Sequence, residues 1–161
     1  MASRAVKLSA VLSGIAGEYL VAAELSRQGY LAAITLRNSQ GIDILASRAD
    51  ATRSVGIQVK TNQYGHPRWV LNAKVERMKA RNLFFVFVNL NASDAPEFHI
   101  VPCREVARFA NRNHRRWMRK PRRDGRPHKN NNIRKFHDDE GAFRNRWDLL
   151  GLGRPGSGRR K

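Results

Sequence analysis

The sequence predicts an α/β fold in which a mixed central β-sheet is flanked by helices. A helical pattern opens the chain, several strand patterns follow it up to residue 101, and a second helical pattern comes after them. The chain has 161 residues, of which 41% are hydrophobic. This is enough for one compact domain with a real core and an appendage.

The first predicted element is a helix over residues 9–28. Apolar residues recur in it at three-to-four-residue spacing, namely Val11, Ile15, Ala22 and Leu25. Gly29 follows as a natural helix end. Gly14 and Gly17 lie inside the helix, where each costs about 1 kcal/mol relative to Ala. We therefore expect these glycines to allow close approach to a sheet or to a ligand backbone.

Three strands are predicted next, over residues 30–37, 42–46 and 54–61. The third strand alternates strictly between apolar and other residues, and the run over 83–90 is almost continuously apolar, as in a buried strand. The remaining predicted elements are short strands over 69–71 and 98–101, a helical turn over 73–80 and a helix over 104–118.

The C-terminal third divides into three parts. Residues 119–135 are dense in Lys, Arg, Pro, Gly and Asn, which predicts a loop that becomes ordered only when bound. Residues 136–152 regain aromatic and leucine side chains and are expected to pack on the core, whereas 153–161 are expected to be disordered. The predicted organisation is a core over 1–118, a basic loop and packing segment over 119–152, and a basic tail over 153–161.

The net charge of +18 indicates a polyanionic partner. Residues 1–102 hold 12 Lys and Arg against 7 Asp and Glu, and residues 103–161 hold 19 against 6. Nucleic acid fits this charge because phosphate contacts release condensed counterions; no membrane partner is expected, since no helix shows large apolar anchors on one face. The side chains predicted to contact phosphate, rather than to form a solvated face, are Arg112, Arg115, Arg116, Arg119, Lys120, Arg122, Arg123, Arg126 and Lys129.

Other features limit the function classes. Cys103 is the single cysteine, which excludes an internal disulfide and a cysteine-based zinc site. No apolar run approaches the ~20 residues of a membrane span, and the N-terminus lacks a convincing signal peptide, so a cytoplasmic protein is expected. The three tryptophans are assigned to core packing, and His66 and Arg68 to a solvated loop rather than to substrate contact.

Four residues suggest a phosphodiesterase centre. Gln58 and Lys60 lie at i and i+2 of the third predicted strand, so both side chains point to one face. Asp43 lies early in the second strand and stands beside them if the two strands form a hairpin. Glu18 lies in or beside the packing stripe of the first helix, where a carboxylate is costly unless paired or metal-bound. Phosphodiester hydrolysis uses such a set: oxygen ligands for a divalent metal, a placed water and a nearby cation.

The sequence resembles the PD-(D/E)XK nuclease superfamily at three motifs. These are G-E-x-x-V-A-x-E-L at 17–25, G-I-D-I-L at 41–45 and I-Q-V-K-T at 57–61. They are similar to those of small archaeal-type junction resolvases and Mrr-type restriction endonucleases. The resemblance implies a restriction-endonuclease-like core that uses Mg²⁺ or Mn²⁺ to cleave double-stranded or branched DNA, with a homodimer expected if both strands are cut. It implies as metal-side residues Glu18, Asp43, Gln58 and the Val59 carbonyl, with Lys60 as the catalytic lysine.

The sequence departs from the superfamily pattern in two places, of which the first changes little and the second, Gln58, keeps a function without cleavage open. Gly41 and Ile42 stand where the superfamily has Pro before the Asp, and Gln58 replaces the usual acid. An amide oxygen coordinates Mg²⁺ without adding negative charge, so metal affinity should fall, although the Mrr-type branch uses the same Gln. The alternatives are a catalytically silent nuclease-fold module that binds DNA or RNA, an RNA-directed enzyme, and a structural basic protein of a nucleoprotein assembly.

Overall fold

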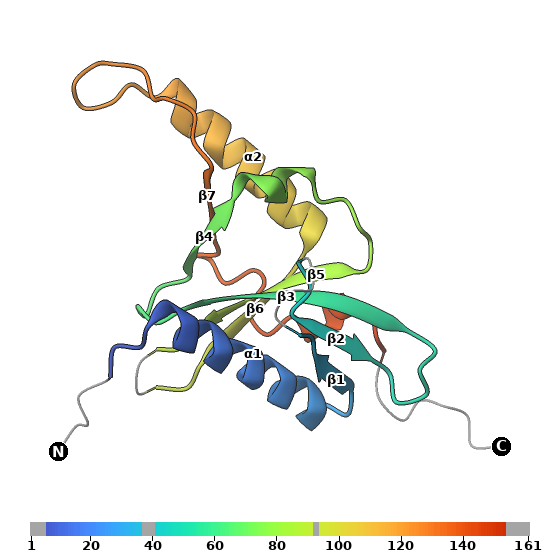
Figure 1. Cartoon of the computed structure of the whole chain (residues 1–161). Coiled ribbons are helices and arrows are strands. Elements are labelled where there is room, and N and C mark those ends of the chain that lie inside the picture. The colour runs from blue at the N-terminus through green and yellow to red at the C-terminus, as the bar shows by residue number, and fades with distance from the viewer. Residues whose placement is uncertain (1–5, 37–40, 92–93, 154–161) are drawn as a thin grey trace.

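The structure is a computed structural model that describes residues 6–36, 41–91 and 94–153. Its central sheet has five strands in the order β1-β2-β3-β5-β6, and only β3 and β5 run parallel. The strands are β1 (Leu31–Ile34), β2 (Ile44–Ser47), β3 (Ser54–Asn62), β5 (Leu83–Asn89) and β6 (Glu97–Pro102). Helices lie on both sides of this mixed sheet, so the predicted fold class is confirmed (Figure 1).

Helix α1 (Ala10–Arg27) covers one face of the sheet (Figure 1). It begins at Ser9, whose hydroxyl accepts a hydrogen bond from the Leu12 amide at 3.2 Å. Its buried side chains Val21 and Leu25 share one apolar cluster with β2, β3, β5 and β6. A Cβ added at Gly17 would overlap the Thr61 side chain, so the predicted close approach is confirmed there, whereas at Gly14 an added Cβ meets nothing.

The opposite face is covered by helix α2 (Cys103–Arg119) and a two-stranded sheet. That sheet pairs β4 (Arg68–Asn72) with β7 (Ile133–His137), and the 3-10 helix η1 (Ala73–Arg77) follows β4. Phe87 of β5 stacks on Phe136 of β7 with 4.4 Å between ring centroids. A second apolar cluster therefore joins the central sheet to elements from the C-terminal third of the chain.

Strand β7 corrects the predicted loop over 119–135, because Ile133, Arg134 and Lys135 belong to this strand. Arg134 and Phe136 alternate inward and are only 6% and 1% exposed. The buried Arg134 guanidinium pairs with Glu76 of η1. Because this inward position is charged, the sequence shows no apolar alternation by which the strand could have been recognised.

The rest of that loop, residues 120–132, folds back on α2. His128 stacks on Trp117 with 3.9 Å between ring centroids. The His114 Nε2 atom lies 2.9 Å from the Asn130 side-chain oxygen. Contacts within the chain therefore hold this segment, where the sequence predicted order only upon binding.

The chain end returns to the α1 side of the sheet. A second 3-10 helix, η2 (Trp147–Leu150), places Leu150 in the first apolar cluster, and Leu152 joins it. Of the tail predicted to be disordered, residues 154–161 lie outside the described residues. The proposed division of the chain after residues 118 and 152 stays a prediction.

Candidate active site and nucleic-acid interface

Asp43 is attached to β3 on both sides of Gln58. The Asp43 amide donates to the Ile57 carbonyl at 2.8 Å, and the Val59 amide donates to the Asp43 Oδ2 atom at 2.7 Å. Asp43 immediately precedes β2 instead of lying in it, because the β1–β2 ladder ends at Ile34 and Ile44. The carboxylate thus accepts the hydrogen bond that a neighbouring strand would otherwise accept from the Val59 amide. Its second oxygen, Oδ1, has no protein donor among the residues described.

Gln58 and Lys60 are half-buried and lie on the face of β3 opposite to Val55, Ile57 and Val59. In the β3–β5 ladder they pair with Phe85 and Phe87, which belong to the α2-side cluster. The three apolar residues of β3 belong to the α1-side cluster. The predicted core-facing side of β3 is therefore confirmed, whereas the side of Gln58 and Lys60 borders a second apolar cluster, so its role as the active surface stays a prediction.

The predicted site residues line two separate pockets. Glu18 and Asp43 line one of about 280 Å³, between the start of α1 and the residues around Thr35 and Ile42. Lys60 lines another of about 620 Å³, which lies between the end of β3, the β4–β7 sheet and α2. Ala10 lines both, so the pockets adjoin at the first turn of α1, whereas Gln58 lines neither.

The pocket of Lys60 is rich in cations and imidazoles. Lys60 and Lys135 meet no carboxylate in the described part of the chain, whereas Arg68 and His137 both contact Asp139, at 3.3 Å and 3.1 Å. The unpaired lysines can therefore bind an anion such as phosphate.

This pocket also shows what the sequence missed. His66 and Arg68, assigned to a solvated loop, line it, and so do Asn113, Lys135 and His137 from α2 and β7. The last three were missed because they lie far from the motif in the sequence. Only the alternation around Phe136 indicates that Lys135 and His137 belong to a strand.

The donors near Asp43 fit a hard divalent cation. In the described ranges no three His, Cys, Asp or Glu side chains gather as a metal site. An ion here would rely on the carboxylates of Asp43 and Glu18, which line one pocket, whereas Gln58 and Val59 do not line it. Mg²⁺ commonly binds through one or two carboxylates and keeps several waters, so this donor set suits it.

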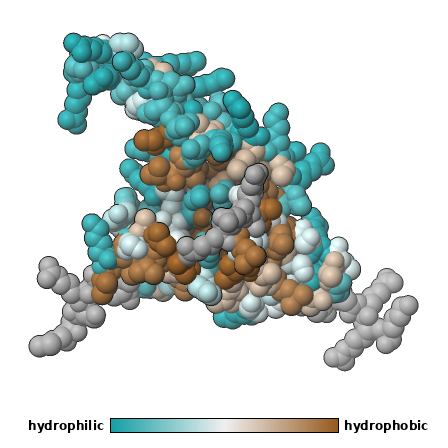
Figure 2. Space-filling view, in the orientation of Figure 1, coloured by the Kyte–Doolittle hydropathy of each residue, from teal (hydrophilic) through white to brown (hydrophobic). Residues whose placement is uncertain are grey.

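The predicted phosphate-binding residues lie on a projecting arm, which we call the basic arm and define as residues 112–132. It comprises the C-terminal half of α2 and the following loop, and it extends away from the sheet (Figure 1). Its visible surface is hydrophilic (Figure 2). The arm holds nine Lys and Arg and a single acid, Asp124, which pairs with Arg122 at 3.5 Å. Nearly all of its positive charge is therefore available to a partner.

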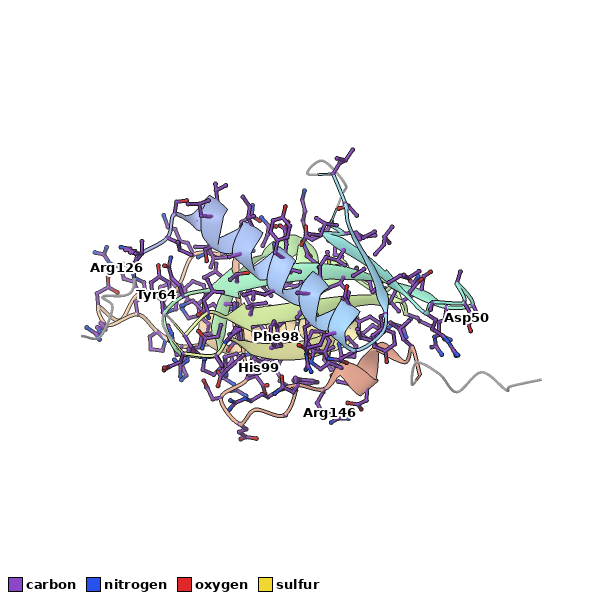
Figure 3. The ribbon with its side chains drawn as sticks, turned by 90° about the horizontal axis from the view of Figure 1, so that it is seen from below. Asp50, Tyr64, Phe98, His99, Arg126 and Arg146 are labelled. Atoms are coloured by element: carbon purple, nitrogen blue, oxygen red, sulfur yellow. The ribbon has the colours of Figure 1, made fainter. Side chains whose placement is uncertain are left out.

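The arm and the Lys60 pocket face the same end of the molecule. In the view from below, Tyr64, which lines that pocket, lies at the same end as Arg126 of the arm, and Asp50 lies at the opposite end (Figure 3). Asn113 of the arm also lines the Lys60 pocket, so the base of the arm borders that pocket.

Two buried titratable groups belong to the fold. The His99 Nδ1 atom lies 2.6 Å from Asp138 Oδ2, and Asp138 also accepts from the Ala142 and Phe143 amides. Neither His99 nor Asp138 lines any of the pockets described above. Burial raises the pKa of the Cys103 thiol, which donates to the Ala80 carbonyl, so Cys103 is not an activated nucleophile.

Comparison with known proteins gives one structural similarity. No protein-family profile and no curated protein sequence matches the chain. Among solved structures, Hjc, a Holliday junction resolvase from Archaeoglobus fulgidus, is similar with 16% identity and a TM-score of 0.44, over 87% of this chain and 88% of that one. A similarity at this level does not assign an activity. Over the described residues, no helix is long and apolar enough to cross a membrane.

Proposed function

We propose that the protein is a metal-dependent DNA endonuclease that hydrolyses phosphodiester bonds at a centre around Asp43 and Lys60. The observation that supports it best is the 2.7 Å hydrogen bond from the Val59 amide to Asp43, which fixes a carboxylate against the β3 backbone at the residue between Gln58 and Lys60 in the sequence. A carboxylate in one pocket and a lysine in the adjoining pocket would supply a metal ligand and a cation for phosphate.

The proposed roles follow from the position of each side chain. Asp43 and Glu18 would hold Mg²⁺ or Mn²⁺ from their shared pocket, with the Gln58 and Val59 oxygens as neutral ligands. Such an ion supplies Lewis-acid stabilisation and lowers the pKa of a bound water. Lys60 would bind a phosphate oxygen and orient the attacking water from the adjoining pocket.

The substrate class rests on charge. The basic arm projects nine cations and one acid, and the Lys60 pocket adds two unpaired lysines. Contacts of this kind bind the phosphate backbone and do not read base sequence. We therefore expect binding to double-stranded or branched DNA with little sequence preference.

A catalytically silent DNA- or RNA-binding module is the second candidate. Two observations favour it: Gln58 brings no charge to the metal side, and Lys60 lines a different pocket from Glu18 and Asp43. In this case the cations bind nucleic acid, and the Asp43 carboxylate serves only to complete the hydrogen bonding of β3.

The test uses Asp43→Asn, Lys60→Ala and, as a matched control, Glu24→Gln on the exposed Arg27 pair of the same helix as Glu18. Asn keeps an oxygen for the Val59 amide, so the fold should be retained. We expect wild type and control to cleave plasmid and branched DNA with Mg²⁺ or Mn²⁺ but not with EDTA. Each site variant should lose at least about 100-fold in rate, which corresponds to about 2.7 kcal/mol.

Metal binding provides a second readout. Titration calorimetry with Mn²⁺ should show weaker binding for Asp43→Asn and unchanged binding for Lys60→Ala. If wild type binds DNA as well as both variants do, and none of the three cuts with either metal, the silent module is the correct function.

A further inference from the structure

A groove of about 870 Å³ runs along α2 beside η1 and the residues that follow it. It lies partly outside the basic arm, since it reaches the first turn of α2. The cations that line it are Lys79, Arg104, Arg108, Arg112, Arg115, Arg116, Arg119 and Lys120.

Five arginines of this groove form one continuous stripe, namely Arg104, Arg108, Arg112, Arg115 and Arg119. They follow each other at steps of three or four residues, so they share one face of α2. With a rise of 1.5 Å per residue, the stripe from Arg104 to Arg119 is about 22 Å long. Successive phosphates of one duplex strand are about 3.4 Å apart along the axis, so the stripe spans about six of them.

The groove has almost no negative charge of its own. Its one acid, Glu76, is already paired with the buried Arg134 from β7. Arg108 contacts Glu105, an exposed pair of small energetic value. The Arg104 Nε atom donates to the Lys79 carbonyl at 2.7 Å, and in the described ranges Arg115 and Arg119 contact no carboxylate. The positive charge of the groove is therefore largely uncompensated.

The composition of the groove favours a duplex over a single strand. Proteins that bind single strands combine cations with aromatic side chains on which bases stack. The described lining of this groove contains no aromatic residue, and its apolar members are Met78 and Ala107. It therefore suits a strand whose bases are turned away into a duplex.

We propose that the α2–η1 groove binds the phosphate backbone of one strand of a DNA duplex, with Lys79, Arg104 and Arg108 extending the contact of the basic arm towards η1. This inference rests on the proposed function, because both require nucleic acid as the partner. Its new content is the side of α2 on which the duplex lies and the cations outside the arm that bind it. The opposite side of α2 carries the Trp117–His128 stack, which anchors the arm.

The test compares two triple variants with the same net charge. The groove variant is Lys79→Gln, Arg104→Gln and Arg108→Gln. The control variant is Arg27→Gln, Arg144→Gln and Arg146→Gln, at exposed arginines that pair with acids elsewhere on the surface. The probes are a DNA duplex of about 20 base pairs and an oligothymidylate of about 20 nucleotides, both long enough to cover the stripe. Binding of each probe is followed by fluorescence anisotropy over a salt series.

We expect the groove variant to lower the slope of log K against log salt by about 2.7 for the duplex, or about 0.9 for each cation lost. The slope for oligothymidylate and the duplex slope of the control variant should change much less. The charge-preserving variant Lys79→Arg, Arg104→Lys and Arg108→Lys should bind with the wild-type slope, which would show that charge and not packing is responsible.

Several results would overturn the inference. An unchanged duplex slope in the groove variant, or an equal loss in the control variant, excludes this groove as the contact. If Arg122→Gln, Arg123→Gln and Arg126→Gln weaken duplex binding and the groove variant does not, the groove inference fails while the proposed function stands. If wild type binds polyglutamate as tightly as the duplex, the groove takes an acidic protein and the nucleic-acid function fails as well.

Discussion

The body of the protein and its basic arm use charge in opposite ways. In the body, two buried polar side chains have partners: Arg134 pairs with Glu76, and His99 Nδ1 lies 2.6 Å from Asp138 Oδ2. In the arm, nine cations share one acid. Charges in the body therefore stabilise the folded chain, whereas those of the arm repel one another until an external polyanion neutralises them.

The arm nevertheless has a defined shape before any partner binds. The His128 ring stacks on Trp117, and His114 contacts Asn130, so the loop is fixed to α2. A loop that is already fixed loses less conformational entropy on binding than a flexible loop does. The difference between the two regions is thus one of charge and not of order.

The largest effect is expected from breaking the Glu76–Arg134 pair in the body. Glu76→Ala leaves a guanidinium uncompensated in a side chain that is 5% exposed. Removing one partner of a buried pair typically costs 3–5 kcal/mol, and we expect about 3 kcal/mol because Arg134 keeps bonds to the Asn131 and Ile133 carbonyls. Urea unfolding measures this, and a loss below about 1 kcal/mol would show that the pair does not hold β7 to η1.

The sequence predicted most of the fold because its strongest patterns are local. The spacing of α1, the alternation of β3 and the apolar run of β5 each identify their element without reference to the rest. β7 was hidden because one of its two inward residues is Arg134. Its burial depends on Glu76, 58 residues away, and a contact at this separation leaves no local pattern.

A smaller effect is expected at the second buried pair. Asp138→Asn keeps the shape of the side chain but removes the charge that faces His99 Nδ1 and the Ala142 and Phe143 amides. Hydrogen bonds to charged groups contribute about 1.5–3 kcal/mol, so we expect a loss of about 2 kcal/mol in unfolding free energy. His99→Asn serves as the partner for a double-mutant cycle, and strict additivity of the two losses would mean that the residues act separately.

The candidate site was predictable only in part. The i and i+2 positions of Gln58 and Lys60 follow from strand geometry, and the hairpin of β2 and β3 brings Asp43 to the β3 backbone at Val59. The separation of Glu18 from Lys60 into adjoining pockets depends on where α1 crosses the end of β3. That crossing is set by contacts such as Gly17 against Thr61, which spacing along one helix does not reveal.

The smallest effect on stability is expected in the arm. Arg122→Gln, Arg123→Gln and Arg126→Gln remove three cations that are exposed, one of them paired at the surface with Asp124. Surface substitutions of this kind usually change stability by less than about 0.5 kcal/mol, and relief of repulsion favours a slight gain.

Thermal unfolding of this arm variant at low and high salt measures that change. The wild type should gain more from added salt than the variant, because salt screens the repulsion that the variant has already lost. The unfolding free energies then compare the two regions: one substitution in the body should destabilise the protein, whereas three substitutions in the arm should not. A loss of more than about 1 kcal/mol in the arm variant would mean that these cations support the fold, since surface substitutions without a structural role stay well below that value.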